Sequence, residues 1–155
     1  MIRKWTVFAL SAGLLLAIAG AGFGLADDDE ESPLGKVMEK VNKQSNAIKK
    51  ATRNLVSYRK SHKDVAKSSK ELIKLAKEAK PLKDALAKAK NEANPQKKWD
   101  ELMDSFIATS EKLSDVAGKS GADAAGLADT KKAFSAVSKS CSECHTVFRV
   151  DETNF

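Results

Sequence analysis

The chain has 155 residues, of which 42% are hydrophobic and 31% charged. This length and composition are typical of one globular domain and exclude an intrinsically disordered chain. The formal net charge of +6 favours anionic partners or indicates a solvated, Lys-rich surface.

The first 26 residues carry the pattern of a secretory signal peptide. A short basic segment precedes an apolar run from Trp5 to Ala26, and the acidic block DDDEE follows. Gly24 and Ala26 suit cleavage after Ala26, which would remove Arg3 and Lys4 and lower the formal charge from +6 to +4. An uncleaved anchor is the alternative, because about 20 apolar residues span a bilayer.

Both alternatives predict an exported, periplasmic domain, for which we expect no nucleic-acid partner. A membrane would be a partner only if the leader is not cleaved. The predicted parts are the leader (1–26), an acidic linker (27–33) and a helical domain (34–155). No strand-like alternation follows Pro33, and the strong helix formers Ala, Lys, Leu and Glu dominate.

Four helices are predicted. The first begins at Ser32-Pro33, a capping residue followed by proline at the first helical position, and extends as far as Tyr58. The second stops before Pro81. One or two further amphipathic turns are predicted within 82–93.

The third helix begins at Asn94-Pro95 and breaks at 118–121, and the fourth begins near Asp123. Each helix has a single apolar stripe, which predicts an all-α antiparallel four-helix bundle. The stripe of the last helix comprises Leu127, Thr130, Phe134, Val137, Cys141, Cys144, His145 and Phe148.

The stretch CSECHTVFR contains both cysteines and one of the two histidines. Cys141, Cys144 and His145 stand at i, i+3 and i+4, so on a helix they share one face. C-x-x-C-H is the attachment signature of c-type haem. Two thiols form thioethers with the vinyl groups on one edge of the macrocycle, and the adjacent imidazole becomes the proximal iron ligand. The sequence therefore predicts one covalent haem c.

Three other interpretations of the motif stay open. A structural zinc site needs four ligands, and only His62 remains outside the cluster as a further histidine. A thioredoxin-like dithiol belongs beside a βαβ unit, which the sequence does not predict. A disulfide suits an oxidising compartment but does not explain the adjacent histidine.

A haem motif on the last helix of a four-helix bundle resembles the class II cytochromes c, the cytochrome c′ family with its low-spin, Met-ligated relatives. The family pattern C-x-x-C-H-x-x-[Tyr/Phe]-Arg is matched by Cys141, Cys144, His145, Phe148 and Arg149. The resemblance implies that Arg149 lies near the proximal side of the haem, although an arginine there also suits the helix dipole. The resemblance also implies a possible homodimer through the first two helices, with a monomer kept apart by its Lys-rich surface as the alternative.

The resemblance also implies that a methionine of the first helix is the sixth iron ligand in low-spin members. Met38 is the candidate here, with a plain core role as the alternative. Such relatives often carry an arginine four residues before the methionine, where this chain has Leu34. Met103 is predicted to be a core residue, and His62 to be exposed near the turn between the first two helices.

The expected function is that of a one-electron carrier with acidic redox partners, not of an enzyme. The alternative is a five-coordinate haem protein that binds nitric oxide or carbon monoxide. Trp99, Phe106, Phe134 and Phe148 are predicted to be core residues, some at the haem edge. The sequence has no Ser/His/Asp set, Gly-rich phosphate loop or paired-carboxylate site that its spacing supports.

Overall fold

The computed structural model describes residues 32–149, and in that range the chain forms helices and no strand. The elements are α1 (Pro33–Ala51), α2 (Leu55–Ala79), the short 3₁₀ turn η1 (Leu86–Lys88), α3 (Pro95–Lys119) and α4 (Ala124–Phe148). The predictions for residues 1–26 and the acidic block lie outside the described residues. No helix among those described is long and apolar enough to cross a membrane.

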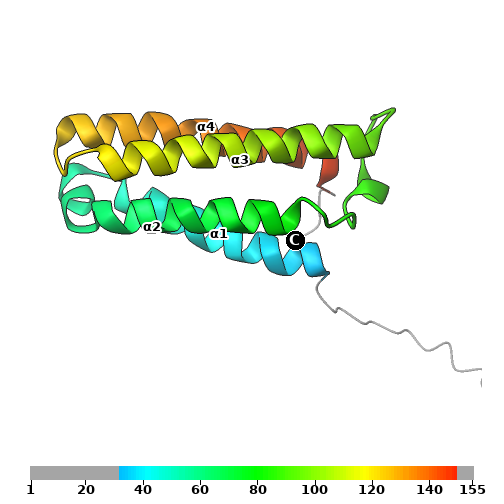
Figure 1. Cartoon of the computed structure of the whole chain (residues 1–155), viewed down its shortest axis with the longest axis horizontal. Coiled ribbons are helices and arrows are strands. Elements are labelled where there is room, and N and C mark those ends of the chain that lie inside the picture. The colour runs from blue at the N-terminus through cyan, green and yellow to red at the C-terminus, as the bar shows by residue number, and fades with distance from the viewer. Residues whose placement is uncertain (1–31, 150–155) are drawn as a thin grey trace, which may run out of the picture.

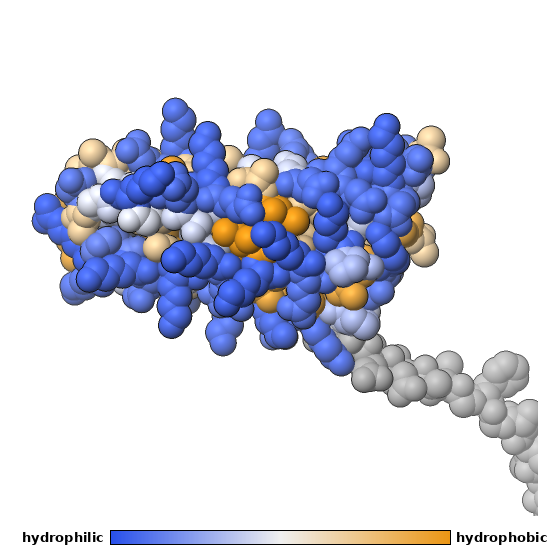
Figure 2. All heavy atoms as spheres, in the orientation of Figure 1, coloured by the Kyte–Doolittle hydropathy of each residue, from blue (hydrophilic) through white to orange (hydrophobic). Residues whose placement is uncertain are grey.

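The four long helices lie side by side in two layers, α1 with α2 and α3 with α4 (Figure 1). Each helix packs against the next one in the chain. This confirms the predicted all-α class with four helices, and the arrangement is compatible with a four-helix bundle. On the face drawn in Figure 2, hydrophilic side chains cover most of the surface, with a small apolar area between the two layers.

Three predicted helix starts are confirmed by side-chain caps. Ser32 Oγ accepts a hydrogen bond from Gly35 N at 3.1 Å. Asn94 Oδ1 accepts one from the N–H of residue 97 at 3.0 Å, and Asp123 Oδ1 accepts one from the N–H of residue 126 at 2.8 Å. Each cap satisfies a backbone donor that has no partner within its own helix.

The prediction that the first helix extends to Tyr58 is wrong. α1 ends at Ala51, and Asn54 caps a new helix by accepting a hydrogen bond from Ser57 N at 2.8 Å. Tyr58 therefore belongs to α2, where it is fully buried. No glycine or proline marks this break, so the apolar spacing continued across it without a visible stop.

The core runs the length of the four helices. α1 contributes Val37 and Ile48, α2 contributes Leu72, and α3 contributes Trp99 and Leu113, all buried. Phe106, Phe148 and Met103 are buried as predicted, whereas Phe134 is half-buried against the core.

Candidate functional site

A cavity of about 690 Å³ lies at one end of the helices. Its walls come from the N-terminal halves of α1 and α3, the C-terminal end of α4, and the segment before and within η1. The up-and-down order of the helices brings these four parts of the chain to the same end (Figure 1). The volume lies within the range of about 300–1,000 Å³ that is usual for cofactor and ligand sites.

The α4 wall of the cavity carries Cys141, Cys144 and His145. Both thiols are half-buried, and His145 is exposed. The predicted stripe is therefore wrong in part, because the buried line on α4 passes through Ala133, Val137 and Ser140 and not through the motif. The motif lies beside that line, at the edge that faces the cavity.

The electrostatics of this wall favour neutral side chains. Burial raises the pKa of the Cys141 thiol above its ordinary value. Burial, with a smaller contribution from the charge of Cys141, raises the pKa of Cys144 to about 11. Partial desolvation lowers the pKa of His145, and the nearby Arg149 guanidinium lowers it further. A neutral imidazole is the form that donates to a metal.

The α1 wall of the same cavity carries Met38. The Met38 side chain is half-buried and packs against the core. Residues 38 and 141 to 145 are far apart in the chain, so their meeting in one cavity is a result of the packing of the helices. The structure thus brings the predicted sixth ligand and the predicted attachment residues to one site.

Aromatic side chains form the floor of the cavity. Trp99, Phe106 and Phe148 line it and are each at most 5% exposed. The rings of Trp99 and Phe148 meet edge to face, with 5.2 Å between their centroids. Met103 also lines the cavity as a buried side chain. Phe134 is not one of its lining residues, so its predicted place on the same stripe does not bring it to the site.

Arg149 lies at the rim of the cavity and is exposed. It follows the last residue of α4 and caps that helix, because its backbone N–H donates to His145 O at 3.1 Å. Its positive charge lies at a helix C-terminus, where it is favourable, as the dipole interpretation expected. Its place beside a haem stays a prediction.

Part of the cavity wall was not predicted from the sequence. Asp84, Ala85 and Lys88 line it from the segment between α2 and α3. Asp84 Oδ2 accepts a hydrogen bond from Leu34 N at 3.1 Å, a contact between residues 50 positions apart. The sequence pattern of 82–93 indicated only a short amphipathic turn, and no local signal places it against α1.

His62 lies away from the cavity. It is half-buried on α2, with its ring centroid 6.2 Å from that of Tyr58, and it does not line the cavity. In the part of the chain that the structure describes, no three His, Cys, Asp or Glu side chains are grouped to hold a metal ion. The zinc interpretation therefore lacks its ligand set there. Both cysteines have free thiols.

The residues around the cavity fit a covalently held haem. The site offers two neighbouring thiols, an imidazole on the residue after the second thiol, a thioether from another helix and an apolar aromatic floor. This donor set is that of c-type haem ligation. Comparisons with known protein families, curated proteins and solved structures found no match to this chain.

Proposed function

We propose that the chain is an exported class II c-type cytochrome that carries one haem and transfers single electrons. Cys141 and Cys144 hold the haem, and His145 is its proximal ligand. The observation that carries this proposal is the cavity of about 690 Å³ that these three residues of α4 line together with Met38 of α1. An isolated C-x-x-C-H motif would support attachment, but a cavity of cofactor size beside it supports a place for the group itself.

The bound haem would supply a centre that accepts and releases one electron. The chain's own residues set its environment. The aromatic floor formed by Trp99, Phe106 and Phe148 limits the access of water, which is one means by which proteins tune reduction potentials. A Met38 thioether on the sixth position would raise the potential relative to an open one.

The proposed partners are acidic redox proteins. The chain has 27 Lys and Arg side chains against 21 Asp and Glu, and hydrophilic side chains cover most of the face drawn in Figure 2. A positive surface speeds encounters with acidic partners and fixes their orientation more than it strengthens binding. An electron carrier needs such a docking surface and no substrate pocket, which is why we propose a carrier and not an enzyme.

The deciding experiment is the absorption spectrum of the exported protein, oxidised, reduced, and reduced with carbon monoxide. A low-spin spectrum that carbon monoxide leaves unchanged would support a sixth protein ligand and electron transfer. A spectrum that shifts with carbon monoxide would replace this proposal with gas binding. A protein without haem absorption would end the cytochrome proposal and return the cysteines to a disulfide or dithiol role.

Substitutions on α4 test the attachment directly. Cys141→Ala should remove one thioether and lower the yield of mature protein, and His145→Ala should abolish normal iron ligation. Ser142→Ala, an exposed neighbour on the same turn, is the matched control and should mature normally. Intact-protein mass and the spectrum are the measurements. A purified Cys141→Ala protein with a doubly attached haem would contradict the proposal.

A further inference from the structure

Residues 80–94 connect α2 to α3 and pass the open end of the helices beside the cavity (Figure 1). We call this segment the strap. It includes η1 and three of the residues that line the cavity, Asp84, Ala85 and Lys88. Its polar contacts reach α1, α3 and α4, the three helices that form the other walls.

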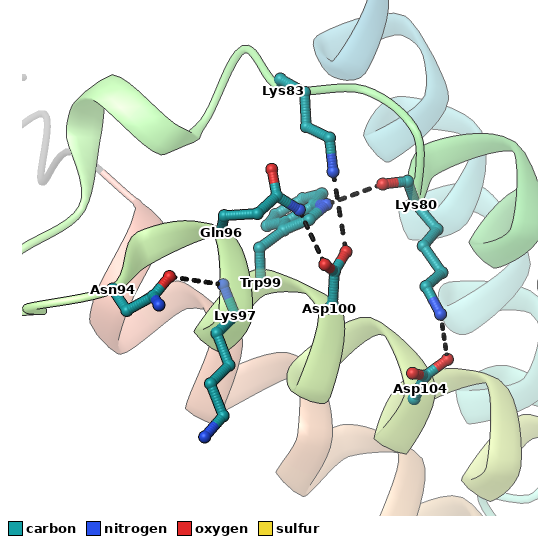
Figure 3. Close-up of polar contacts among 8 residues, drawn as sticks. All are labelled: Lys80, Lys83, Asn94, Gln96, Lys97, Trp99, Asp100 and Asp104. Atoms are coloured by element: carbon teal, nitrogen blue, oxygen red, sulfur yellow. Dashed lines mark hydrogen bonds and ion pairs between the residues drawn. The ribbon is translucent and has the colours of Figure 1, made fainter.

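The strap is fixed to α3 at its start (Figure 3). Lys80 O accepts a hydrogen bond from Trp99 Nε1 at 2.9 Å, and the Lys80 ammonium pairs with Asp104. Lys83 Nζ lies 3.6 Å from Asp100 Oδ1. The hydrogen bond from the Gln96 amide, together with the Lys83 charge, lowers the pKa of Asp100, which keeps this carboxylate ionised at neutral pH.

The strap is fixed to α4 near its end. Lys90 N donates to Val147 O at 2.9 Å, which satisfies a carbonyl in the last turn of α4, within the same turn as the motif. The next residue, Asn91, has φ of 53°. Asparagine adopts this left-handed conformation more readily than most residues, and the chain turns there toward α3.

The contact with α1 is made by Asp84. Pro33 has no N–H to donate, Gly35 N donates to Ser32 Oγ, and Lys36 N donates to Ser32 O. Leu34 N is the remaining donor of the first turn, and its acceptor is Asp84 Oδ2 at 3.1 Å. α1 has no acidic residue in its own first turn, so Asp84 also supplies negative charge at this helix N-terminus.

The position of Leu34 matters because Met38 follows it by four residues. On a helix, residues at i and i+4 lie one above the other on the same face. Both line the cavity. A carboxylate that fixes the backbone at Leu34 therefore also fixes the turn that presents Met38 to the cavity.

We propose that Asp84 is a positioning residue: through Leu34 N it holds the first turns of α1, and so keeps the Met38 side chain at the cavity, where Met38 would be the sixth ligand of the proposed haem. This inference rests on the proposed function. It adds a specific role for the strap, which decides between a closed and an open sixth position. Loss of the Asp84 contact would loosen the first turns of α1 and favour the gas-binding state.

Two variants and one control test the proposal in the full, exported protein. Asp84→Ala removes the acceptor, whereas Asp84→Asn keeps an acceptor oxygen without the charge. Asp115→Ala is the control, because Asp115 is an exposed carboxylate that pairs with Lys119 at the far end of α3. The first readout, amide hydrogen exchange of residues 34–38, does not depend on haem.

We expect amide exchange in residues 34–38 to be about tenfold faster in Asp84→Ala, since a charge-assisted hydrogen bond is lost. Asp84→Asn should restore most of the protection, and Asp115→Ala should match the unaltered chain. The second readout is the rate at which the reduced protein binds carbon monoxide. It should rise about tenfold in Asp84→Ala, and this rise should vanish when Met38 is already replaced by alanine.

Unchanged amide exchange in Asp84→Ala would overturn the proposal. A second outcome would also overturn it: Asp84→Ala speeds amide exchange but leaves the rate of carbon monoxide binding unchanged, although Met38→Ala alone raises that rate. Carbon monoxide binding that never responds to Met38→Ala would overturn the Met38 role as well. A protein without haem would instead end the proposed function, and the exchange measurement would still decide whether Asp84 holds α1.

Discussion

At the scale of single residues, the two motif cysteines are weak acids in the chain without haem. Burial raises both thiol pKa values, that of Cys144 to about 11. The thiolate is the reactive form, so little of it is present near pH 8. This environment should slow the oxidation and alkylation of both thiols.

We therefore predict slow alkylation of the haem-free protein. At pH 8, iodoacetamide should modify Cys144 at least about tenfold more slowly than it modifies free cysteine, because the thiolate fraction is smaller. Mass spectrometry over time gives the rate, and the Cys141→Ser variant isolates Cys144. Reaction as fast as free cysteine would contradict the burial seen here.

A second residue-scale prediction concerns Ser110 on α3. Its side chain is fully buried, and its Oγ has no hydrogen-bond partner among the described residues. An unsatisfied buried hydroxyl is destabilising, and alanine is also the better helix former. Ser110→Ala should raise the free energy of unfolding by about 1 kcal/mol, measured by urea denaturation. Ser69→Ala is the control, because the buried Ser69 hydroxyl has a partner and donates to Val65 O. If Ser69→Ala raises the free energy of unfolding by the same amount, helix propensity alone explains the effect.

At the scale of helices, Tyr58 and Thr130 join α2 to α4. Their hydroxyl oxygens lie 2.9 Å apart, and both side chains are fully buried. Tyr58→Phe should lower the free energy of unfolding by about 1–2 kcal/mol, because the Thr130 hydroxyl stays buried without this partner. Thermal or urea denaturation measures the loss.

The double variant Tyr58→Phe with Thr130→Val tests whether the unpaired hydroxyl causes the loss of stability. It removes both polar groups and leaves similar shapes, so it should be less destabilised than the sum of the two single variants. Additive effects would mean that the two hydroxyls do not depend on each other.

Helix positions were largely predictable from the sequence, because their signals are local. The capping residues Ser32, Asn94 and Asp123 each act on a donor three residues away. The break before Asn54 was missed because a cap without proline or glycine resembles any polar residue on a helix surface. The predicted buried face of α4 differed from the observed one for a related reason. Small residues such as Ser140 are buried where helices approach closely, and the spacing of hydrophobic residues does not reveal them.

At the scale of the whole molecule, charge should govern the encounter with the proposed redox partners. The formal net charge is +6 over the full chain and would be +4 after cleavage at Ala26, so it is positive in both forms. The rate of electron exchange with an anionic reagent such as hexacyanoferrate should fall as salt is raised from 10 to 500 mM. Stopped-flow absorbance measures it. A cationic reagent should show the opposite trend, and a rate independent of salt for both would contradict steering by the net charge.

The candidate site was predictable only in its parts. The attachment residues are adjacent in the chain, so helical spacing alone grouped Cys141, Cys144 and His145. Met38 was a candidate by its stripe and by resemblance, and the packing of consecutive helices brings α1 and α4 to one cavity. The contribution of Asp84 was not predictable, because it depends on a contact with the distant Leu34 that only the assembled helices create.

Trp99 gives the cavity an intrinsic fluorescence signal. The chain has two tryptophans, Trp5 and Trp99, so in a Trp5→Phe protein all indole fluorescence comes from the cavity floor. The indole is held in place by its hydrogen bond to Lys80 O and by the ring of Phe148. A strongly absorbing group that enters the cavity would quench this emission, and water that enters would shift it to the red. Trp99 is therefore an intrinsic fluorescent probe, whose emission would report when a ligand or water enters the cavity.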